Sequence, residues 1–153
     1  MDNKKIPAKR VGIVSLKLVK ESGVLYETRK ISNPYDAYTL VKNFLVDSDR
    51  AKFVVACLDT KNQPVNISIV SIESVNSTVV HPREVFKVDM LNNASKIICF
   101  HNHPSGNLKH SKEDETITDR LKECGEILGI ELVDHIIVGD NDEYFSFKEN
   151  CLM

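Results

Sequence analysis

The sequence predicts a single α/β domain, and three observations favour this fold class. The chain has 153 residues, a length that suits one domain with a sizeable hydrophobic core. Short apolar runs typical of buried strands occur at 53–58, 97–100 and 135–138. Segments in which apolar residues recur at helical spacing lie between the strands. This order predicts a mixed sheet with helices packed against it.

The composition excludes several classes of protein. Hydrophobic residues make up 42% and charged residues 27% of the chain, and the net charge is −2. This balance does not support a nucleic-acid partner. No apolar stretch approaches the roughly 20 residues that span a bilayer, and no secretory segment follows the charged start of the chain. Because Cys57 and Cys99 lie inside apolar runs, we expect buried free thiols and a cytoplasmic protein.

The first part of the chain predicts a β-hairpin ahead of the domain. Residues 11–31 alternate apolar and polar side chains on both sides of a Glu-Ser-Gly turn. We therefore assign residues 1–32 to an N-terminal hairpin extension and residues 33–153 to the domain. The domain opens with a helix, for which Asn33 is the expected N-cap and Pro34 the first helical residue.

The remaining elements follow from apolar periodicity and from turn residues. A Lys-Asn-Gln-Pro turn joins the first two strands, and Gly129 ends the longest helix. In chain order we expect a first helix that ends at 47–49, strands 53–58 and 65–74, a helix at 82–91, strand 97–100, a helix at 111–128, and strands 135–138 and 144–147.

The segment after strand 97–100 has the pattern of a metal site. His101 and His103 stand two residues apart at a strand end, so both imidazoles point to the same side. Pro104 then turns the chain away, and Asp114 lies in the first turn of the next helix. Two imidazoles and one carboxylate, with a position left for water, are the usual ligands of a catalytic zinc ion. The pattern therefore predicts a zinc site at the mouth of the sheet.

Each of these residues also has an interpretation without a metal. Ser111 is a natural N-cap, and Asp114 suits the positive end of the helix dipole. The other histidines are expected to be structural: His81 in a turn before a helix, His110 in a solvated loop, and His135 paired locally with its neighbour. The conjunction of strand, His-x-His, Pro-Gly turn and capped helix favours the metal site.

The run HNHPSGNLKHSKED at 101–114 resembles the JAMM (MPN-plus) metalloprotease signature, in which His-x-His-Pro is followed by Ser-x-x-Asp. It is most similar to the bacterial RadC family, and the stretches 58–64, 80–86 and 132–139 resemble that family as well. The resemblance runs from about residue 33 to the end of the sequence. RadC proteins usually carry a helix-hairpin-helix region ahead of this domain, where the present chain predicts a β-hairpin.

The resemblance implies a cytidine-deaminase-like α-β-α sandwich, the MPN/JAB fold, with zinc as the cofactor. It implies that His101, His103 and Asp114 are the metal ligands. Ser111 would donate a hydrogen bond to the oxyanion that develops during amide hydrolysis.

One position departs from the pattern that the resemblance implies. JAMM enzymes use a glutamate as general base, and the matching position in this chain is Ala51. A methyl group cannot accept a proton, and general acid–base catalysis contributes about 10²–10⁴-fold. Glu84 is the substitute we nominate, although a carboxylate there also suits a helix N-terminus. Glu73 is a weaker candidate.

These observations leave several functions to compare. The first is a zinc metallopeptidase or isopeptidase that hydrolyses an amide bond of a peptide or protein substrate. The second is a catalytically weakened MPN interaction module, which Ala51 favours. A link to DNA repair, which the RadC name implies, gains no support from the charge. A zinc nucleobase deaminase needs His-x-Glu and Pro-Cys-x-x-Cys, and the sequence contains neither. Exposed strand edges would allow a homo-oligomer.

Overall fold

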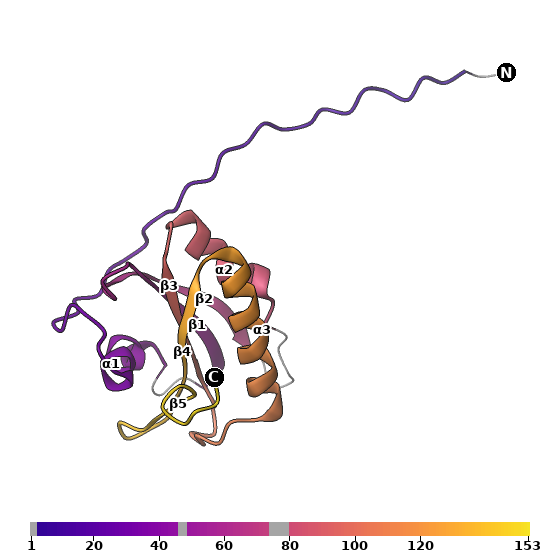
Figure 1. Ribbon diagram of the computed structural model, residues 1–153. Helices are drawn as coiled ribbons and strands as arrows, with labels where there is room; N and C mark the ends of the chain where they lie inside the picture. Colours follow the sequence, from indigo (N-terminus) through magenta and orange to yellow (C-terminus); the bar gives the residue numbers. More distant parts are fainter. Residues whose placement is uncertain (1–2, 46–48, 74–79) are drawn as a thin grey trace.

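A five-stranded mixed sheet with helices on both faces forms the body of the molecule (Figure 1). The computed structural model describes residues 3–45, 49–73 and 80–153, without the side chains of residues 72 and 73. The elements in chain order are α1 (Pro34–Leu45), β1 (Ala51–Leu58), β2 (Pro64–Glu73), α2 (Pro82–Leu91), β3 (Lys96–Asn102), α3 (Lys112–Leu128), β4 (Glu131–Val138) and β5 (Tyr144–Ser146). No helix among these residues is long and apolar enough to cross a membrane.

The strand order brings the end of β3 and the start of α3 together. The order across the sheet is β2-β1-β3-β4-β5. Neighbouring strands are antiparallel except β3 and β4, which are parallel. Parallel strands need a crossover connection, and α3 provides it. The chain therefore leaves the carboxyl end of β3, enters the first turn of α3, and returns to start β4 beside β3.

Two hydrophobic layers confirm the predicted α-β-α sandwich. Helix α1 covers one face of the sheet, and α2 and α3 cover the other (Figure 1). The central strand β1 contributes to both layers, because Val54 packs on the α1 side and Val55 on the α2–α3 side. This explains its continuous apolar run, in which residues 53–58 are all buried as predicted. Cys57 and Cys99 are buried free thiols, also as predicted.

The helices begin at the residues that the sequence indicated. The side-chain oxygen of Asn33 accepts the Asp36 N–H at 2.9 Å, so Asn33 is the N-cap of α1. Gly129 adopts a left-handed φ of 72° directly after α3. The predicted end of α1 falls largely on residues 46–48, outside the described part of the chain. Strand β4 begins four residues earlier than predicted, at Glu131, because the buried Asp134 interrupts its apolar pattern.

The predicted N-terminal hairpin is wrong, since residues 3–26 form no strand. We call residues 3–25 the N-terminal arm. Its apolar side chains stay in solvent, with Ile13 fully exposed and Leu16 76% exposed. Alternating polarity stabilises a strand only when its apolar face is buried. The predicted hairpin would have no such cover, and an isolated two-stranded hairpin is only marginally stable in water. The arm extends away from the domain (Figure 1).

Asp89 is a buried carboxylate on the sheet-facing side of α2. Its Oδ1 accepts a hydrogen bond from the Cys57 thiol at 2.6 Å, and its Oδ2 has no hydrogen-bond partner among the described residues. Burial raises the pKa of the Asp89 carboxyl to about 6, and the Cys57 hydrogen bond only partly opposes this. The folded state therefore holds the Asp89 proton more tightly than the unfolded chain does.

We predict that Asp89→Asn gains stability relative to the wild type as the pH rises from 4 to 7. Well below pH 4 both states of the wild type are protonated at Asp89 and nothing is lost. Between pH 4 and the folded-state pKa of about 6 the unfolded chain releases this proton while the folded state retains it, so the wild type loses stability, and the loss levels off at about 2–3 kcal/mol above pH 6. Urea unfolding across this range with chelator present measures the difference. Asp119→Asn, at an exposed position of α3, is the control, and a pH-independent difference for Asp89→Asn would contradict the prediction.

Candidate metal centre

His101, His103 and Asp114 converge as the sequence predicted. Their facing ligand atoms all lie within 4.8 Å of one another. The two Nε2 atoms are 3.0 Å apart, and the Asp114 carboxylate lies 3.2 Å from His101 Nε2 and 3.3 Å from His103 Nε2. The cluster lies where β3 ends and α3 begins, at the carboxyl ends of the parallel strands. Ligand sites of open α/β sheets usually lie at this edge.

A tight turn after β3 holds His103. The Gly106 N–H donates to the His103 carbonyl at 2.8 Å, and Gly106 has a left-handed φ of 75° that a residue without Cβ adopts readily. The turn brings the Asn107 carbonyl to 2.7 Å from His103 Nδ1. A carbonyl only accepts hydrogen bonds, so Nδ1 carries the hydrogen and Nε2 of the neutral ring presents a lone pair.

A capping box at the start of α3 holds Asp114. The Ser111 hydroxyl oxygen accepts the Asp114 N–H at 3.1 Å, and Asp114 Oδ2 accepts the Ser111 N–H at 2.8 Å. Burial raises the pKa of the Asp114 carboxyl, but without a metal a proton shared with the facing His101 and His103 imidazoles, together with the Ser111 N–H, outweighs burial and holds this pKa well below its usual range. Asp114 is therefore a carboxylate at neutral pH. The helix-cap interpretation and the ligand interpretation of Asp114 describe the same geometry.

A buried hydrogen-bond chain orients His101. Thr118 donates its one hydroxyl hydrogen to the Asp114 carbonyl at 2.7 Å, so its oxygen accepts from His135 Nδ1 at 2.6 Å. Burial holds the pKa of His135 well below its usual range, and the ring is neutral. Its Nε2 then accepts from His101 Nδ1 at 2.8 Å. His101 Nε2 is left with a lone pair that points at the cluster.

His135 and Thr118 are the functional residues that the sequence interpretation missed. His135 was expected to pair with Asp134, but Asp134 accepts a hydrogen bond from the His135 backbone N–H, at 2.7 Å, and none from its imidazole. The imidazole instead points into the α2–α3 side of the sheet, where it stacks on Phe147. A histidine within a buried strand was the available signal, because a buried imidazole needs a partner for each ring nitrogen.

The donor set fits a cation. Two imidazole lone pairs and a carboxylate face one another at 3.0–3.3 Å. Electron-rich atoms this close repel one another unless a positive charge lies among them. Imidazole and carboxylate ligands together suit zinc and other first-row divalent metals. The residues present therefore could bind a metal ion at this point.

The cluster opens into a cavity of about 370 Å³. Its wall is formed by the starts of β1 and α3, the end of β3 and the turn that follows, with the lining residues Ala51, Lys52, Phe53, Val80, His101, Asn102, His103, Pro104, Glu113, Asp114 and Ile117. The buried Asn102 side chain fixes the start of β1 beside it, because its amide accepts the Lys52 N–H at 2.8 Å and donates to the Arg50 carbonyl at 3.0 Å. Ala51 is thereby held on the wall of the cavity.

The nominated catalytic residues lie at different places. Glu84 is not brought to the cluster. It is exposed on α2 and pairs with Lys87 at 2.7 Å, and this hydrogen bond lowers the pKa of its carboxyl. Glu73 faces Ala51 in the β1–β2 register, but its side chain lies outside the described residues. Ser111 is the exposed N-cap of α3, beside the cavity lining rather than part of it. Its catalytic role stays a prediction.

Comparison with known proteins identifies the family. The model of the RadC-like JAB domain matches residues 31–152. The chain belongs to this family. The match covers the sheet, the three helices and all three residues of the His101, His103 and Asp114 cluster. It confirms the resemblance and the fold class that the sequence indicated.

The RadC-like relatives extend beyond this chain. A UPF0758 protein of Clostridioides difficile (strain 630) is 49% identical over 124 residues, which are 81% of this chain and 52% of that protein. A UPF0758 protein of Methanosarcina mazei is 46% identical over 121 residues, 79% of this chain and 52% of the relative. One from Rubrobacter xylanophilus is 42% identical over 123 residues, with coverages of 80% and 53%. The chain thus spans about half the length of these relatives.

We predict that Thr118→Val lowers the affinity for zinc about 10–100-fold, because the His135 tautomer is then no longer fixed and His101 loses its orientation. Thr116→Val is the matched control: the Thr116 hydroxyl also donates to a carbonyl four residues earlier, at 3.0 Å, but it faces solvent. Competition with a chromogenic chelator measures both affinities. Equal affinities in the two variants would exclude a role for the buried chain of hydrogen bonds.

Proposed function

We propose that the protein is a zinc-dependent hydrolase of amide bonds in peptides or proteins. The observation that carries the proposal is a set of three protein ligands on the wall of an open cavity. Structural zinc sites are closed by four protein ligands, whereas catalytic sites keep one position open. The cavity, at about 370 Å³, is large enough to admit part of a peptide chain.

Different residues would bind the metal and stabilise the oxyanion in this reaction. His101, His103 and Asp114 hold the metal, which in such sites acidifies water and polarises a carbonyl oxygen. The Ser111 oxygen accepts the Asp114 N–H, so the hydroxyl keeps its own hydrogen to donate to a developing oxyanion. The first turn of α3 adds the positive end of the helix dipole, which also favours an oxyanion.

Glu113 is the general base that we now favour. Among the described residues that line the cavity, the carboxylates are Glu113 and Asp114. Since Asp114 is assigned as a ligand, Glu113 remains to take the proton from water and return it to the leaving nitrogen. Glu113 lines the same cavity as the three candidate ligands, while Ala51 offers no basic atom.

A weakened module that binds a partner is the second candidate, and Ala51 on the cavity wall is the observation that favours it. In that case the metal would stabilise the fold, and the cavity would bind a peptide without cleaving it. The free thiols of Cys57 and Cys99 support a cytoplasmic location for either activity. A DNA-processing role is not favoured by the net charge of −2.

We predict about one zinc ion per chain in protein purified without chelator. Asp114→Asn should lose it, because the amide retains the capping oxygen but not the charge. His101→Ala should also lose the metal with little loss of fold, since the cluster lies at the mouth of the sheet. Elemental analysis measures the metal, and Asp119→Asn is the control on the same helix. Stoichiometric zinc in Asp114→Asn or His101→Ala would refute the ligand assignment.

We predict that Glu113→Gln lowers hydrolysis of internally quenched fluorogenic peptides by about 10²-fold or more, and that Ala51→Glu raises it. The zinc content of both variants should match the wild type, which separates a base from a ligand. Glu84→Gln is the control, since the Glu84 side chain is exposed on α2 and does not line the cavity. Zinc-loaded protein that cleaves no peptide, even with Ala51→Glu, would favour the binding module instead.

A further inference from the structure

We propose that the N-terminal arm pairs as an added strand with the open edge of β2 in a second copy of the chain. Two copies would exchange arms reciprocally and form a dimer with twofold symmetry. This form of association exchanges one identical segment between chains and needs no other partner. The proposal is independent of the metal centre.

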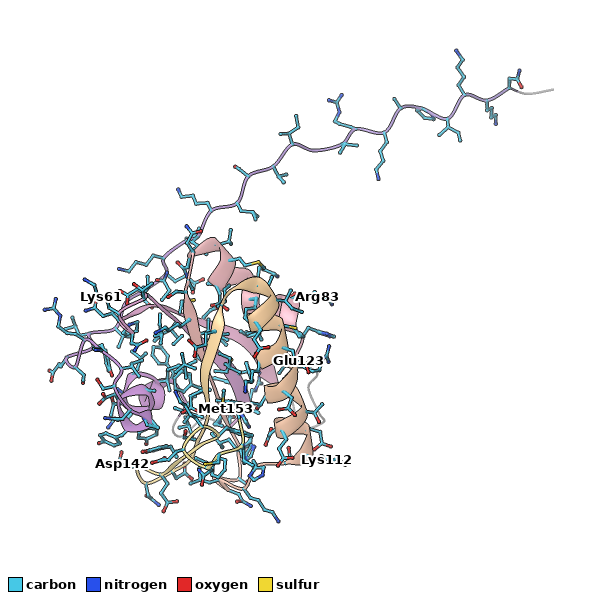
Figure 2. The ribbon with its side chains drawn as sticks, in the orientation of Figure 1. Lys61, Arg83, Lys112, Glu123, Asp142 and Met153 are labelled. Atoms are coloured by element: carbon cyan, nitrogen blue, oxygen red, sulfur yellow. The ribbon has the colours of Figure 1, made fainter. Side chains whose placement is uncertain are left out.

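The arm has the composition of a strand without a neighbour. Its apolar side chains are among the most exposed of the molecule, and they point into solvent along its length (Figure 2). They include Ile6, Val11, Ile13, Val14, Leu16, Val19 and Leu25, each at least 76% exposed. β-branched and leucine side chains at this density are typical of a strand with a buried face. Residues 3–25 make no hydrogen bond to the domain within the described chain.

Strand β2 offers the matching edge. It pairs with β1 on one side and stands at the end of the strand order, so its other side has no strand beside it in the described chain. Helix α1 packs mainly on β3, β4 and β5, and on that side of the sheet Ile67 of β2 packs against the core. Val65 and Ile69 on that side are 56% and 48% exposed. Edge strands are usually protected by charges, by a bulge or by a cover. The described side chains of β2 carry no charge, and its register with β1 shifts at Val70 and at Val65.

The base of the arm directs it away from β2 of its own domain. The Ile31 N–H donates to the Asn62 carbonyl at 2.9 Å, and the Tyr26 hydroxyl donates to the Asp36 carbonyl at 2.8 Å. These contacts hold the chain between the β1–β2 turn and α1, and the arm leaves the domain from there (Figure 1). Residues 11–20 then equal β2 in length, with ten residues each. The edge of β2 in a second copy is therefore long enough to receive them, with register irregularities at Val65 and Val70.

The N-terminal part of the chain and the domain carry net charges of opposite sign. Residues 1–32 contain eight lysine or arginine residues and three acidic ones, so this part is basic. The remaining 121 residues contain 12 basic and 19 acidic residues. An arm and the domain of a second copy therefore carry net charges of opposite sign, which favours association. Cross-strand neighbours for Val65 and Ile69 would supply the apolar part of the contact.

Sedimentation velocity of the full chain over a range of concentrations tests the proposal, and we expect a monomer–dimer equilibrium. Leu16→Asp in the arm and Ile69→Asp on the edge should each raise the dimer dissociation constant at least about tenfold. Ile6→Asp, outside the pairing stretch, and Ile127→Asp, 84% exposed on α3, are the controls. Thermal unfolding verifies that each variant is folded.

Mixing the two variants distinguishes an exchanged arm from other dimers. A mixed dimer of Leu16→Asp and Ile69→Asp chains retains one junction of unaltered arm and unaltered edge, so it should be tighter than either homodimer. A monomeric full chain would overturn the proposal, including one whose arm pairs with its own β2. So would a dimer that Leu16→Asp leaves unchanged, or a mixture no tighter than the separate variants.

Discussion

The capping box at the start of α3 fixes the Asp114 carboxylate, and the candidate metal centre is arranged around that carboxylate. The reciprocal bonds with Ser111 hold one carboxylate oxygen at 2.8 Å from a backbone N–H, while the other faces His101 at 3.2 Å. A cap is local, so the carboxylate direction is fixed as soon as the helix forms. The chain reaches this point from β3 by one turn, which brings His103 to the same place. The same pair of hydrogen bonds thus caps the helix and orients the candidate ligand.

The second requirement is that both imidazoles offer a lone pair to the same point. His103 achieves this through one exposed turn, in which the Asn107 carbonyl fixes Nδ1. His101 achieves it through a buried chain, with His135 and Thr118 behind it. The parallel pairing of β3 and β4 makes Cys99 the register partner of His135. His101 lies two residues after Cys99 and points to the same face of the sheet, so the His135 side chain lies next to it. A buried neutral imidazole costs little when both nitrogens are bonded, so the sheet itself holds the ligand in position.

The sequence predicted what local signals encode and missed what depends on distant contacts. The caps of α1 and α3, the buried runs and the three ligands follow from residues close together in the chain. The role of His135 does not, because it arises from strand pairing across 34 residues with His101. His110 likewise was expected in solvent, but it pairs with Glu115 and stacks on Phe145. The prediction of an N-terminal hairpin was wrong because it relied on a local pattern alone. Alternating polarity shows that a segment could bury one face as a strand, but it does not show that another part of the chain is there to cover that face.

The candidate ligands and the proposed catalytic groups depend on different parts of this domain. The Ser111 cap, the turn at Gly106 and the hydrogen bonds behind His101 all act without Ala51. A change at that position would therefore alter the proposed proton chemistry of the cavity and leave the geometry of the candidate ligands intact. The reverse does not hold, because loss of Asp114 removes a helix cap and a ligand together. The cavity wall is thus free to vary in catalytic competence while the fold continues to specify the same three ligands.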